Sequence, residues 1–327
     1  MKEVELKMLE RAKALLESGE VARVVGWKKG DFVFDPSPAV FESVEELEKD
    51  FVDNWFCGAN LSKYLIQIAK KEGKTAVFLK PCDTYSFNQL VKEHRIKREN
   101  VHVIAVECLA KLDVEKIKAQ GVSSVVNVEV EGEIVSVTDL YGDVTALNKA
   151  DLLLSKCAVC NKTHQAKDEE IILREKPAKD ADRFEEVKKL ESMTEDERFA
   201  FWREQLSKCI RCNACRNVCP ACSCVKCVFD NPASGISAKA NDDKFEEQLF
   251  HVIRAFHVAG RCTDCGECSR VCPQNIPLHL LNRKFIKDID GFYGEYQAGE
   301  TSEGKTPLTS YTEGDVEAKD VLNGEAK

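Results

Sequence analysis

Two cysteine runs of identical spacing constrain this chain most. Each has the pattern Cys-x-x-Cys-x-x-Cys-x-x-x-Cys-Pro, the first at residues 209–220 and the second at residues 262–273. Three thiolates spaced in this way wrap a short loop around one [4Fe-4S] cubane, and where two runs occur together the cysteine before proline binds the other cubane. We therefore predict cluster 1 on Cys209, Cys212, Cys215 and Cys272, and cluster 2 on Cys262, Cys265, Cys268 and Cys219.

A structural zinc site is the competing interpretation, because zinc also binds four thiolates from Cys-x-x-Cys pairs. Zinc predicts pairs, whereas both runs here are complete quadruplets that end in Cys-Pro. Residues 1–10 carry charges where a signal peptide would be apolar, so export is not predicted. Thiols inside the cell are kept reduced, which makes disulfides a poor explanation for the sixteen cysteines. We expect a cytoplasmic protein with reduced thiols.

The composition is that of a globular protein, with 43% hydrophobic and 31% charged residues over 327 positions. This length suits two domains. The net charge of -9 argues against a nucleic-acid partner, because phosphate contacts need clustered Lys and Arg. No stretch reaches the roughly 18 apolar residues of a membrane span, so we expect protein or small-molecule partners.

Residues 1–160 alternate between helical and strand patterns, which predicts an α/β domain. Short apolar runs at residues 75–79 and 101–106 suit buried parallel strands. Residues 125–137 form two alternating segments around Glu131 and Gly132, which predicts a hairpin on the edge of the sheet. Helices are predicted near residues 4–16, 60–71, 86–94 and 114–119.

The second half of the chain is predicted to be mainly helical. Residues 161–196 are rich in charge and predict a solvated linker with one short helix. A capping box at Thr194 and Glu197 opens residues 197–290, a two-cluster ferredoxin domain. Its central helix carries a predicted packing stripe, and residues 291–327, with eight acidic and three basic residues, predict an extended tail. The stripe comprises Phe245, Leu249, Val252, Ile253 and Phe256.

Eight cysteines remain outside the two clusters, the number that two more clusters would need. Cys82 and Cys108 follow predicted strands, whose carboxyl ends converge on one crevice in open α/β sheets. Ordinary burial is the alternative for these two, and zinc is the alternative for the paired cysteines. We predict up to four [4Fe-4S] clusters, with candidate further ligands at Cys57, Cys82, Cys108, Cys157, Cys160, Cys222, Cys224 and Cys227.

Sites for other cofactors are weakly indicated. No Gly-x-Gly-x-x-Gly follows a strand, and no Gly-x-x-x-x-Gly-Lys loop occurs. Lys80, Asp83 and Thr84 lie between a strand and a helix start, where backbone N–H groups favour an anion, although a capped turn is an equal alternative. The histidines near apolar helices predict packed residues.

These motifs resemble the β subunits of coenzyme F420-reducing hydrogenase and F420-dependent formate dehydrogenase. The resemblance rests on residues 76–83 (AVFLKPCD), on residues 98–108 (RENVHVIAVEC), and on residues 209–220 with Cys222 and Cys224. Residues 259–268 also resemble the two-cluster ferredoxin domains of heterodisulfide reductase. The family resemblance implies FAD and electron exchange with F420. Residues 6–26 contain only two glycines, so this chain departs from the glycine-rich start of flavin-bearing members.

Our leading hypothesis is an electron-relay subunit without bond chemistry of its own. It would serve a multi-subunit oxidoreductase such as a formate dehydrogenase, a hydrogenase or a heterodisulfide-reductase-type complex. The alternative is an FAD-containing enzyme that itself reduces or oxidises F420 or another hydride carrier. A zinc-bearing scaffold protein is the third hypothesis.

Overall fold

The computed structural model describes residues 2–174, 181–231 and 244–309, and the chain divides into two units. Unit 1 comprises residues 1–87 and 96–181, and unit 2 comprises residues 88–95 and 182–327. The last eighteen residues of the predicted tail, from residue 310 onward, lie outside the described residues. The domain bounds at residues 160, 196 and 290 stay predictions. Within the described residues, no helix has the length and apolar character needed to span a bilayer.

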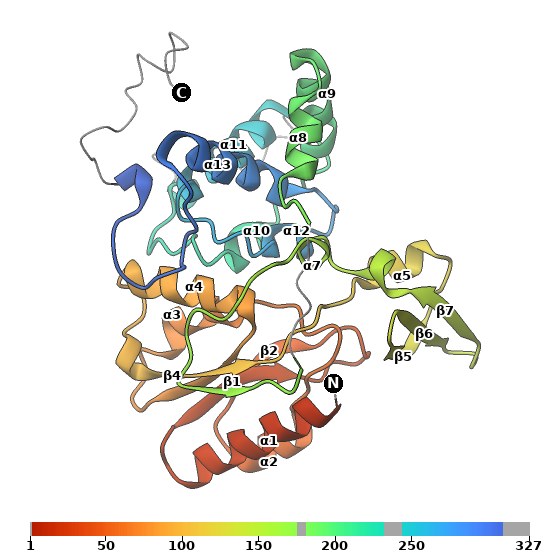
Figure 1. Ribbon diagram of the computed structural model, residues 1–327, viewed down its shortest axis with the longest axis vertical. Coiled ribbons are helices and arrows are strands. Elements are labelled where there is room, and N and C mark those ends of the chain that lie inside the picture. Colours follow the sequence, from red (N-terminus) through yellow and green to blue (C-terminus); the bar gives the residue numbers. More distant parts are fainter. Residues whose placement is uncertain (1, 175–180, 232–243, 310–327) are drawn as a thin grey trace. The chain divides into compact units, whose positions relative to one another are not determined.

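Unit 1 is built around a five-stranded sheet with the order β2-β1-β3-β4-β8. Strand β2 pairs antiparallel with β1, and the other neighbours pair in parallel. Helices α1 and α2 cover one side of this sheet, and α3 and α4 cover the other (Figure 1). The elements are α1 Lys2–Glu17, β1 Arg23–Lys28, β2 Ser37–Phe41, α2 Val44–Asp50, η1 Leu61–Tyr64, α3 Leu65–Ile68, β3 Thr75–Leu79, α4 Pro81–Lys92, η2 Arg98–Asn100, β4 Val101–Val106 and β8 Glu169–Ile171.

The core of unit 1 follows from its apolar periodicity. Strands β3 and β4 are buried along their whole lengths, as expected for parallel strands covered on both faces, and their predicted bounds are confirmed. Helix α1 buries Val4, Met8, Ala12 and Leu15, which share one face at helical spacing. Gly19 follows with a φ of 69°, the left-handed conformation that commonly ends a helix.

The predicted hairpin forms, but its place in the fold was predicted wrongly. Strands β5 (Val125–Glu131) and β6 (Ile134–Asp139) pair antiparallel, and β7 (Val144–Asn148) joins them in a separate three-stranded sheet. This sheet buries its own apolar face, including Val135 and Val137, against helices α5 and α6. It therefore needs no edge of the larger sheet. The helices that follow or flank it are α5 Val114–Ala119, α6 Lys149–Leu152 and α7 Ser155–Ala158.

The edge of the larger sheet is completed by β8, which comes from the predicted solvated linker. Charged residues hold β8 at the edge of this sheet. One Asp168 carboxylate oxygen accepts from the backbone N–H of Val103 at 2.7 Å, and the other accepts from Arg98 at 2.7 Å. Glu169 contacts both Arg11 and His102 at 2.6 Å. The charge-rich composition predicted a solvated linker, whereas several of its charged side chains anchor a strand.

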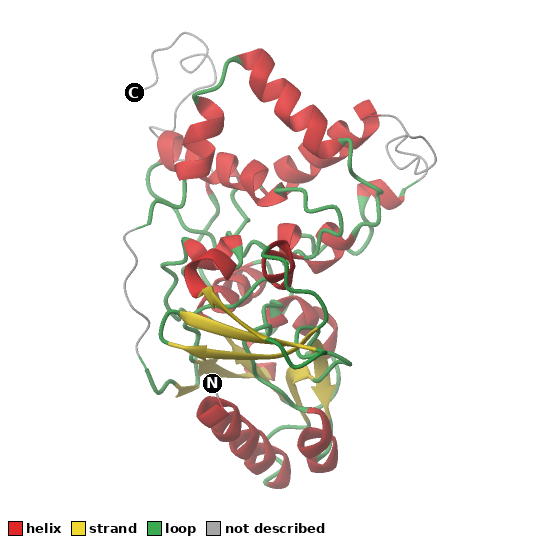
Figure 2. Cartoon of the chain, turned by 90° about the vertical axis from the view of Figure 1, so that its right-hand side faces the viewer, coloured by secondary structure: helices red, strands yellow, loops and turns green. Residues whose placement is uncertain are grey.

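Unit 2 consists of helices joined by long loops, shown in red and green in Figure 2. The predicted capping box is confirmed at the start of α9, where Thr194 and Glu197 exchange hydrogen bonds. Helices α9, α11 and α13 pack together around an apolar cluster that includes Leu206, Phe250 and Leu278. The elements are α8 Glu185–Glu191, α9 Glu195–Leu206, α10 Ala214–Val218, η3 Val228–Asp230, α11 Lys244–Val258, α12 Glu267–Arg270, α13 Leu278–Tyr293 and η5 Pro307–Thr309.

Helix α11 presents a different face to the interior from the one predicted. Of the predicted packing stripe, Ile253 packs partly against the core, but Phe245 is 67% exposed and Phe256 is 60% exposed, and Leu249 and Val252 are also exposed. The opposite face is buried and carries Phe250, Ala255 and Val258 together with the polar residues Glu247, His251 and Arg254. Because this face points toward the cysteine loops, polar groups there matter for the site.

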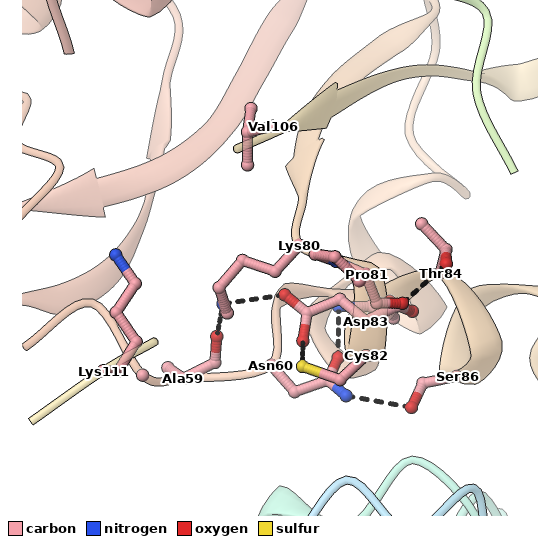
Figure 3. A network of polar contacts seen from close by, with 12 residues as sticks. Ala59, Asn60, Lys80, Pro81, Cys82, Asp83, Thr84, Ser86, Val106 and Lys111 are labelled. Atoms are coloured by element: carbon pink, nitrogen blue, oxygen red, sulfur yellow. Dashed lines mark hydrogen bonds and ion pairs between the residues drawn. The ribbon is translucent and has the colours of Figure 1, made fainter. Parts of the chain in front are cut away.

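A buried polar network fixes the turn between β3 and α4 (Figure 3). The Lys80 ammonium lies 2.8 Å from the Asp83 carboxylate, donates to the carbonyl of Ala59 at 2.7 Å, and lies 4.3 Å from the centre of the Trp27 ring. Lys80 is 2% exposed and Asp83 is fully buried. Thr84 donates to the carbonyl of Pro81 at 2.7 Å. The turn is thus held by internal polar contacts.

Replacing Lys80 with Met should destabilise the protein by about 3–5 kcal/mol, because it leaves the Asp83 carboxylate buried without a counter-charge. Urea unfolding followed by circular dichroism measures the change. The exposed Lys70→Met substitution is the control, with an expected effect of about 0.5 kcal/mol or less. Equal stability of the two variants would contradict this account of the turn.

Candidate iron-sulfur sites

The two cysteine runs adopt the same backbone conformation. In the first loop, Arg211 and Asn213 have φ values of 50° and 63°, and in the second loop Asp264 and Gly266 have 57° and 66°. These residues occupy matching places, two and four positions after the first cysteine of each run. Three of the four are not glycine, and a left-handed conformation is costly for such residues unless the surroundings enforce it. Each loop then enters a short helix, α10 or α12, that carries the third cysteine.

A buried ion pair holds each loop in this conformation. Arg211 Nε lies 2.8 Å from the Glu247 carboxylate on α11, and Asp264 accepts from Arg283 on α13 at 2.8 Å. All four side chains are at most 12% exposed. The loop residue is the cation in the first pair, Arg211, and the anion in the second pair, Asp264. In both loops, the residue that forms the ion pair has a left-handed conformation. Packed helices therefore determine where the thiols of each run point.

The four predicted ligands of cluster 1 line one cavity in unit 2. Its lining includes Cys209, Cys212 and Cys215 from the first run and Cys272 from the second, together with Ile210, Phe250 and His251. Cys212 is exposed, whereas Cys215 is buried. Burial raises the pKa of Cys209 to about 12. The pairing of three near cysteines with the remote Cys272 thus matches the predicted ligand set, and ligation itself stays a prediction.

The predicted ligands of cluster 2 are more deeply enclosed. Cys219, Cys265 and Cys268 are buried, and Cys262 packs with Cys219 and Val258. Burial raises the pKa of Cys262 well above its usual value, and the charges of Asp264, Cys219 and Cys265 add to this effect. Cys219 differs, because a hydrogen bond from the Cys222 thiol is the largest influence on it and lowers its pKa to about 6. Cys222 therefore supports a ligand of cluster 2.

The buried face of α11 lies beside these thiols. His251 is 1% exposed, and neither of its ring nitrogens has a hydrogen-bond partner. Burial, with the charges of Arg254 and Arg211, lowers the pKa of His251 to about 3, so its ring is neutral at pH 7. Sequence reasoning missed His251 and Arg254 as residues of the site. The signal was present, because both interrupt an apolar helix between the two runs.

In the described part of the chain, the thiols are not gathered as closely as in a zinc site. A tetrahedral zinc bound at about 2.3 Å by each thiolate requires sulfur atoms about 3.8 Å apart. Among the described residues, the only Cys, His, Asp or Glu group of three with ligand atoms all within 4.8 Å is Cys209, Glu247 and His251. Glu247 already pairs with Arg211. Thiolates of a cubane bind four different irons, so wider spacing is expected for an iron-sulfur cluster.

A second group of thiols gathers in unit 1. Cys82 and Cys108 follow the carboxyl ends of β3 and β4. Cys157 lies in helix α7, and Cys160 follows that helix. Burial raises the pKa of Cys108 to about 12, and the neighbouring thiols that contribute are Cys157 and Cys160. Burial also raises the pKa of Cys82, with contributions from Asp83 and Cys160. Electrostatic interactions thus link these four predicted ligands, and ligation by them stays a prediction.

The other candidate cysteines have different surroundings, each described within its own unit. The Cys57 thiol is fully buried and contacts the Asn54 backbone N–H at 3.3 Å and the Val52 carbonyl at 3.8 Å. Cys224 and Cys227 belong to unit 2, where Cys224 is exposed near Arg261 and Cys227 packs against the core of that unit. Cys222, also in unit 2, lies against Cys219.

The predicted cofactor-binding residues Lys80, Asp83 and Thr84 are buried, and their polar atoms contact one another or nearby backbone. Cofactor binding there stays a prediction. Lys111, which sequence reasoning did not single out, lies beside the unit 1 thiols. Burial would lower its pKa, but Asp53, Cys57 and Cys108 outweigh burial and raise it, so Lys111 is a buried cation.

Comparisons with known proteins support the interpretation of the motifs. A family model described as a 4Fe-4S dicluster domain matches residues 205–276. The F420-dependent formate dehydrogenase subunit beta of Methanocaldococcus jannaschii is 23% identical, with 85% of this chain and 88% of that protein covered. The putative ferredoxin-3 of Sinorhizobium fredii is 36% identical over 79 residues, which cover 24% of this chain and 75% of that protein.

Among solved structures, a chain of the F420-reducing [NiFe] hydrogenase complex from Methanosarcina barkeri is 17% identical, with a TM-score of 0.36 and coverage of 48% of this chain and 62% of that chain. The predicted resemblance to the formate dehydrogenase β subunits is confirmed by the relative from Methanocaldococcus jannaschii. Through its dicluster region, the chain belongs to the family of 4Fe-4S dicluster ferredoxins.

Proposed function

We propose that this chain is an iron-sulfur electron-transfer subunit of a multi-subunit oxidoreductase. The observation that carries the proposal is the cavity lined by Cys209, Cys212, Cys215 and Cys272, because it joins three cysteines of one run to the remote cysteine of the other. A relative over most of the chain is named as the β subunit of a formate dehydrogenase. Partners from a formate dehydrogenase, a hydrogenase or a heterodisulfide-reductase-type complex, and a cytoplasmic location, stay predictions.

The residues around the thiols fit negatively charged clusters. Arg254 is 2% exposed, and its Nε and Nη1 atoms have no hydrogen-bond partner. Buried polar groups are normally paired, so two unpaired guanidinium nitrogens indicate an acceptor that binds there. Thiolates and the sulfides of a [4Fe-4S] cluster are such acceptors. The donor set of four thiols per site agrees with this fit.

A [4Fe-4S] cluster supplies reversible transfer of single electrons. The chain's own residues would control access to it. Cys219, Cys265 and Cys268 are buried, so the cluster 2 site is shielded from water. Cys212 and its neighbour Ile210, which is 60% exposed, open the cluster 1 site to the surface of unit 2. We infer that a redox partner approaches on the side of Cys212.

We propose a third cluster on the thiols that gather in unit 1, namely Cys82, Cys108, Cys157 and Cys160. Among the cations that favour the Cys108 thiolate, Lys111 has the largest effect, and Lys156 and Lys80 act on Cys82 in the same way. Cations lower the cost of bringing thiolates into a buried site. Cys57 is excluded from this set, because its thiol bonds to local backbone. A fourth cluster, which would need Cys224 and Cys227, stays a prediction.

Replacing Cys272 with Ala should remove one cluster, because Cys272 completes the set of Cys209, Cys212 and Cys215. The anaerobically purified variant should lose about four irons per chain and the paramagnetic signal of one reduced cluster. The control is Cys224→Ala, which removes an exposed thiol outside both sets and should keep all the iron. Full iron content in Cys272→Ala would disprove the ligand set.

The third cluster predicts about twelve irons per chain in the wild-type protein, at four per cubane. Cys108→Ala should lower this number by about four, whereas Cys57→Ala should leave it unchanged. Both changes remove a thiol from unit 1, so they are matched for location. Iron and acid-labile sulfide are measured on anaerobic samples. About eight irons in the wild-type protein would be accounted for by clusters 1 and 2 and would rule out the third cluster.

A second candidate function is favoured by the name of the first relative, which is F420-dependent. In this alternative, the chain itself binds FAD and exchanges electrons with F420 or another hydride carrier. The relay function predicts only broad thiolate-to-iron absorption in the purified protein and no release of FAD on denaturation. A flavin spectrum with stoichiometric FAD release would instead establish the alternative.

A further inference from the structure

Arg254 lies between the two cysteine runs, on the buried face of α11. The thiols that act on its guanidinium are Cys268, Cys219, Cys215 and Cys222. Cys268 and Cys219 belong to the predicted ligand set of cluster 2, and Cys215 belongs to that of cluster 1. A single cation is thus placed within electrostatic reach of both sites.

Among the described residues, Arg254 pairs with no carboxylate, and its Nε and Nη1 atoms have no hydrogen-bond partner, while the Cys268 thiol accepts a hydrogen bond from its guanidinium. The groups that raise its pKa against the effect of burial are thiols. The two other buried arginines beside the loops differ, since Arg211 pairs with Glu247 and Arg283 pairs with Asp264, each at 2.8 Å. An isolated charge in the interior is very costly unless an opposite charge compensates it. The unpaired Nε and Nη1 atoms show that the protein side of this compensation is incomplete.

The neighbours of Arg254 on the same helix do not supply the missing charge. His251, one turn earlier, is neutral because burial lowers its pKa to about 3. Glu247, two turns earlier, is engaged by Arg211. Among the residues that the structure describes, the groups left to balance Arg254 are therefore the thiolates, together with what they bind.

We propose that Arg254 is a positioning residue shared by the two clusters, which supplies one counter-charge and N–H donors to the sulfur atoms of both sites. This inference rests on the proposed function. Reduction adds one negative charge to a cluster, and a cation held nearby in a low-dielectric interior favours the reduced form. Cluster potentials depend on net charge and on hydrogen bonds to sulfur. Arg254 therefore raises the reduction potentials of both clusters together.

The test compares Arg254→Gln with Arg254→Lys in the full-length, anaerobically purified chain. Iron content is measured first, and the midpoint potential of each cluster is then measured by redox titration with paramagnetic resonance detection. In the Gln variant, both potentials should shift downward. The Lys variant keeps the positive charge but has fewer N–H donors, so both midpoint potentials should shift downward by less than in the Gln variant. Arg203→Gln, which removes an exposed charge on α9, is the control and should leave both potentials unchanged.

Unchanged potentials in Arg254→Gln, or a shift of one cluster alone, would overturn the shared role. If the Gln variant does not assemble, the Lys variant decides: a downward shift of both clusters supports the proposal, and an unchanged potential at either cluster overturns it. A failure of the proposed function is recognised separately, because the wild-type chain would then contain no iron. A wild-type protein with both clusters and insensitive potentials would refute the role of Arg254 alone.

Discussion

Bringing many thiolates into a buried region is the electrostatic constraint on which this structure depends. Burial raises the pKa of eight of these thiols, for example to about 12 at Cys209 and about 11 at Cys268. Each ionised thiolate therefore carries a desolvation cost that nearby positive charge or bound metal must offset. Unit 2 meets this constraint with rigid loops, since a thiolate can be stabilised only where its partner is held in place.

The same solution recurs in both units with different cations. In unit 2 the cation beside the thiols is Arg254, whose Nε and Nη1 atoms have no hydrogen-bond partner, whereas in unit 1 Lys111 is shared between Asp53 and the thiols of Cys57 and Cys108. Lys111 lies 3.1 Å from Asp53, and both side chains are 3% exposed. Part of its charge is thus already balanced by protein. A cation with a carboxylate partner mainly stabilises the fold, while one without such a partner is available to the metal site.

Local patterns in the sequence were sufficient for much of the fold. The continuous apolar runs at residues 75–79 and 101–106 became β3 and β4, and Thr194 with Glu197 capped α9 as predicted. These features depend on neighbours in sequence. The place of β8 depended on distant partners, because Asp168 is bound by Val103 and Arg98. No periodicity within a charge-rich segment can indicate such contacts.

For the candidate sites, as for the fold, the features that depend on sequence spacing were predictable and those that depend on distant contacts were not. Spacing alone assigned Cys272 to the cavity of Cys209, Cys212 and Cys215, because a cubane requires a remote ligand. Spacing could not separate Cys57 from the four thiols that gather in unit 1. That distinction depends on the hydrogen bonds of Cys57 to Asn54 and Val52, which exist only in the folded chain.

Helix α11 shows why hydrophobic periodicity can select the wrong face. Phe245, Leu249, Val252 and Phe256 repeat at helical spacing and would ordinarily mark the side toward the core. That rule assumes that the core is filled by apolar side chains. Here the space beside α11 is lined by thiols, so the face with Glu247, His251 and Arg254 is the one that is buried. An interior shaped to hold a charged group requires charged and hydrogen-bonding residues in its wall, and hydrophobicity then predicts the outer face of the helix instead.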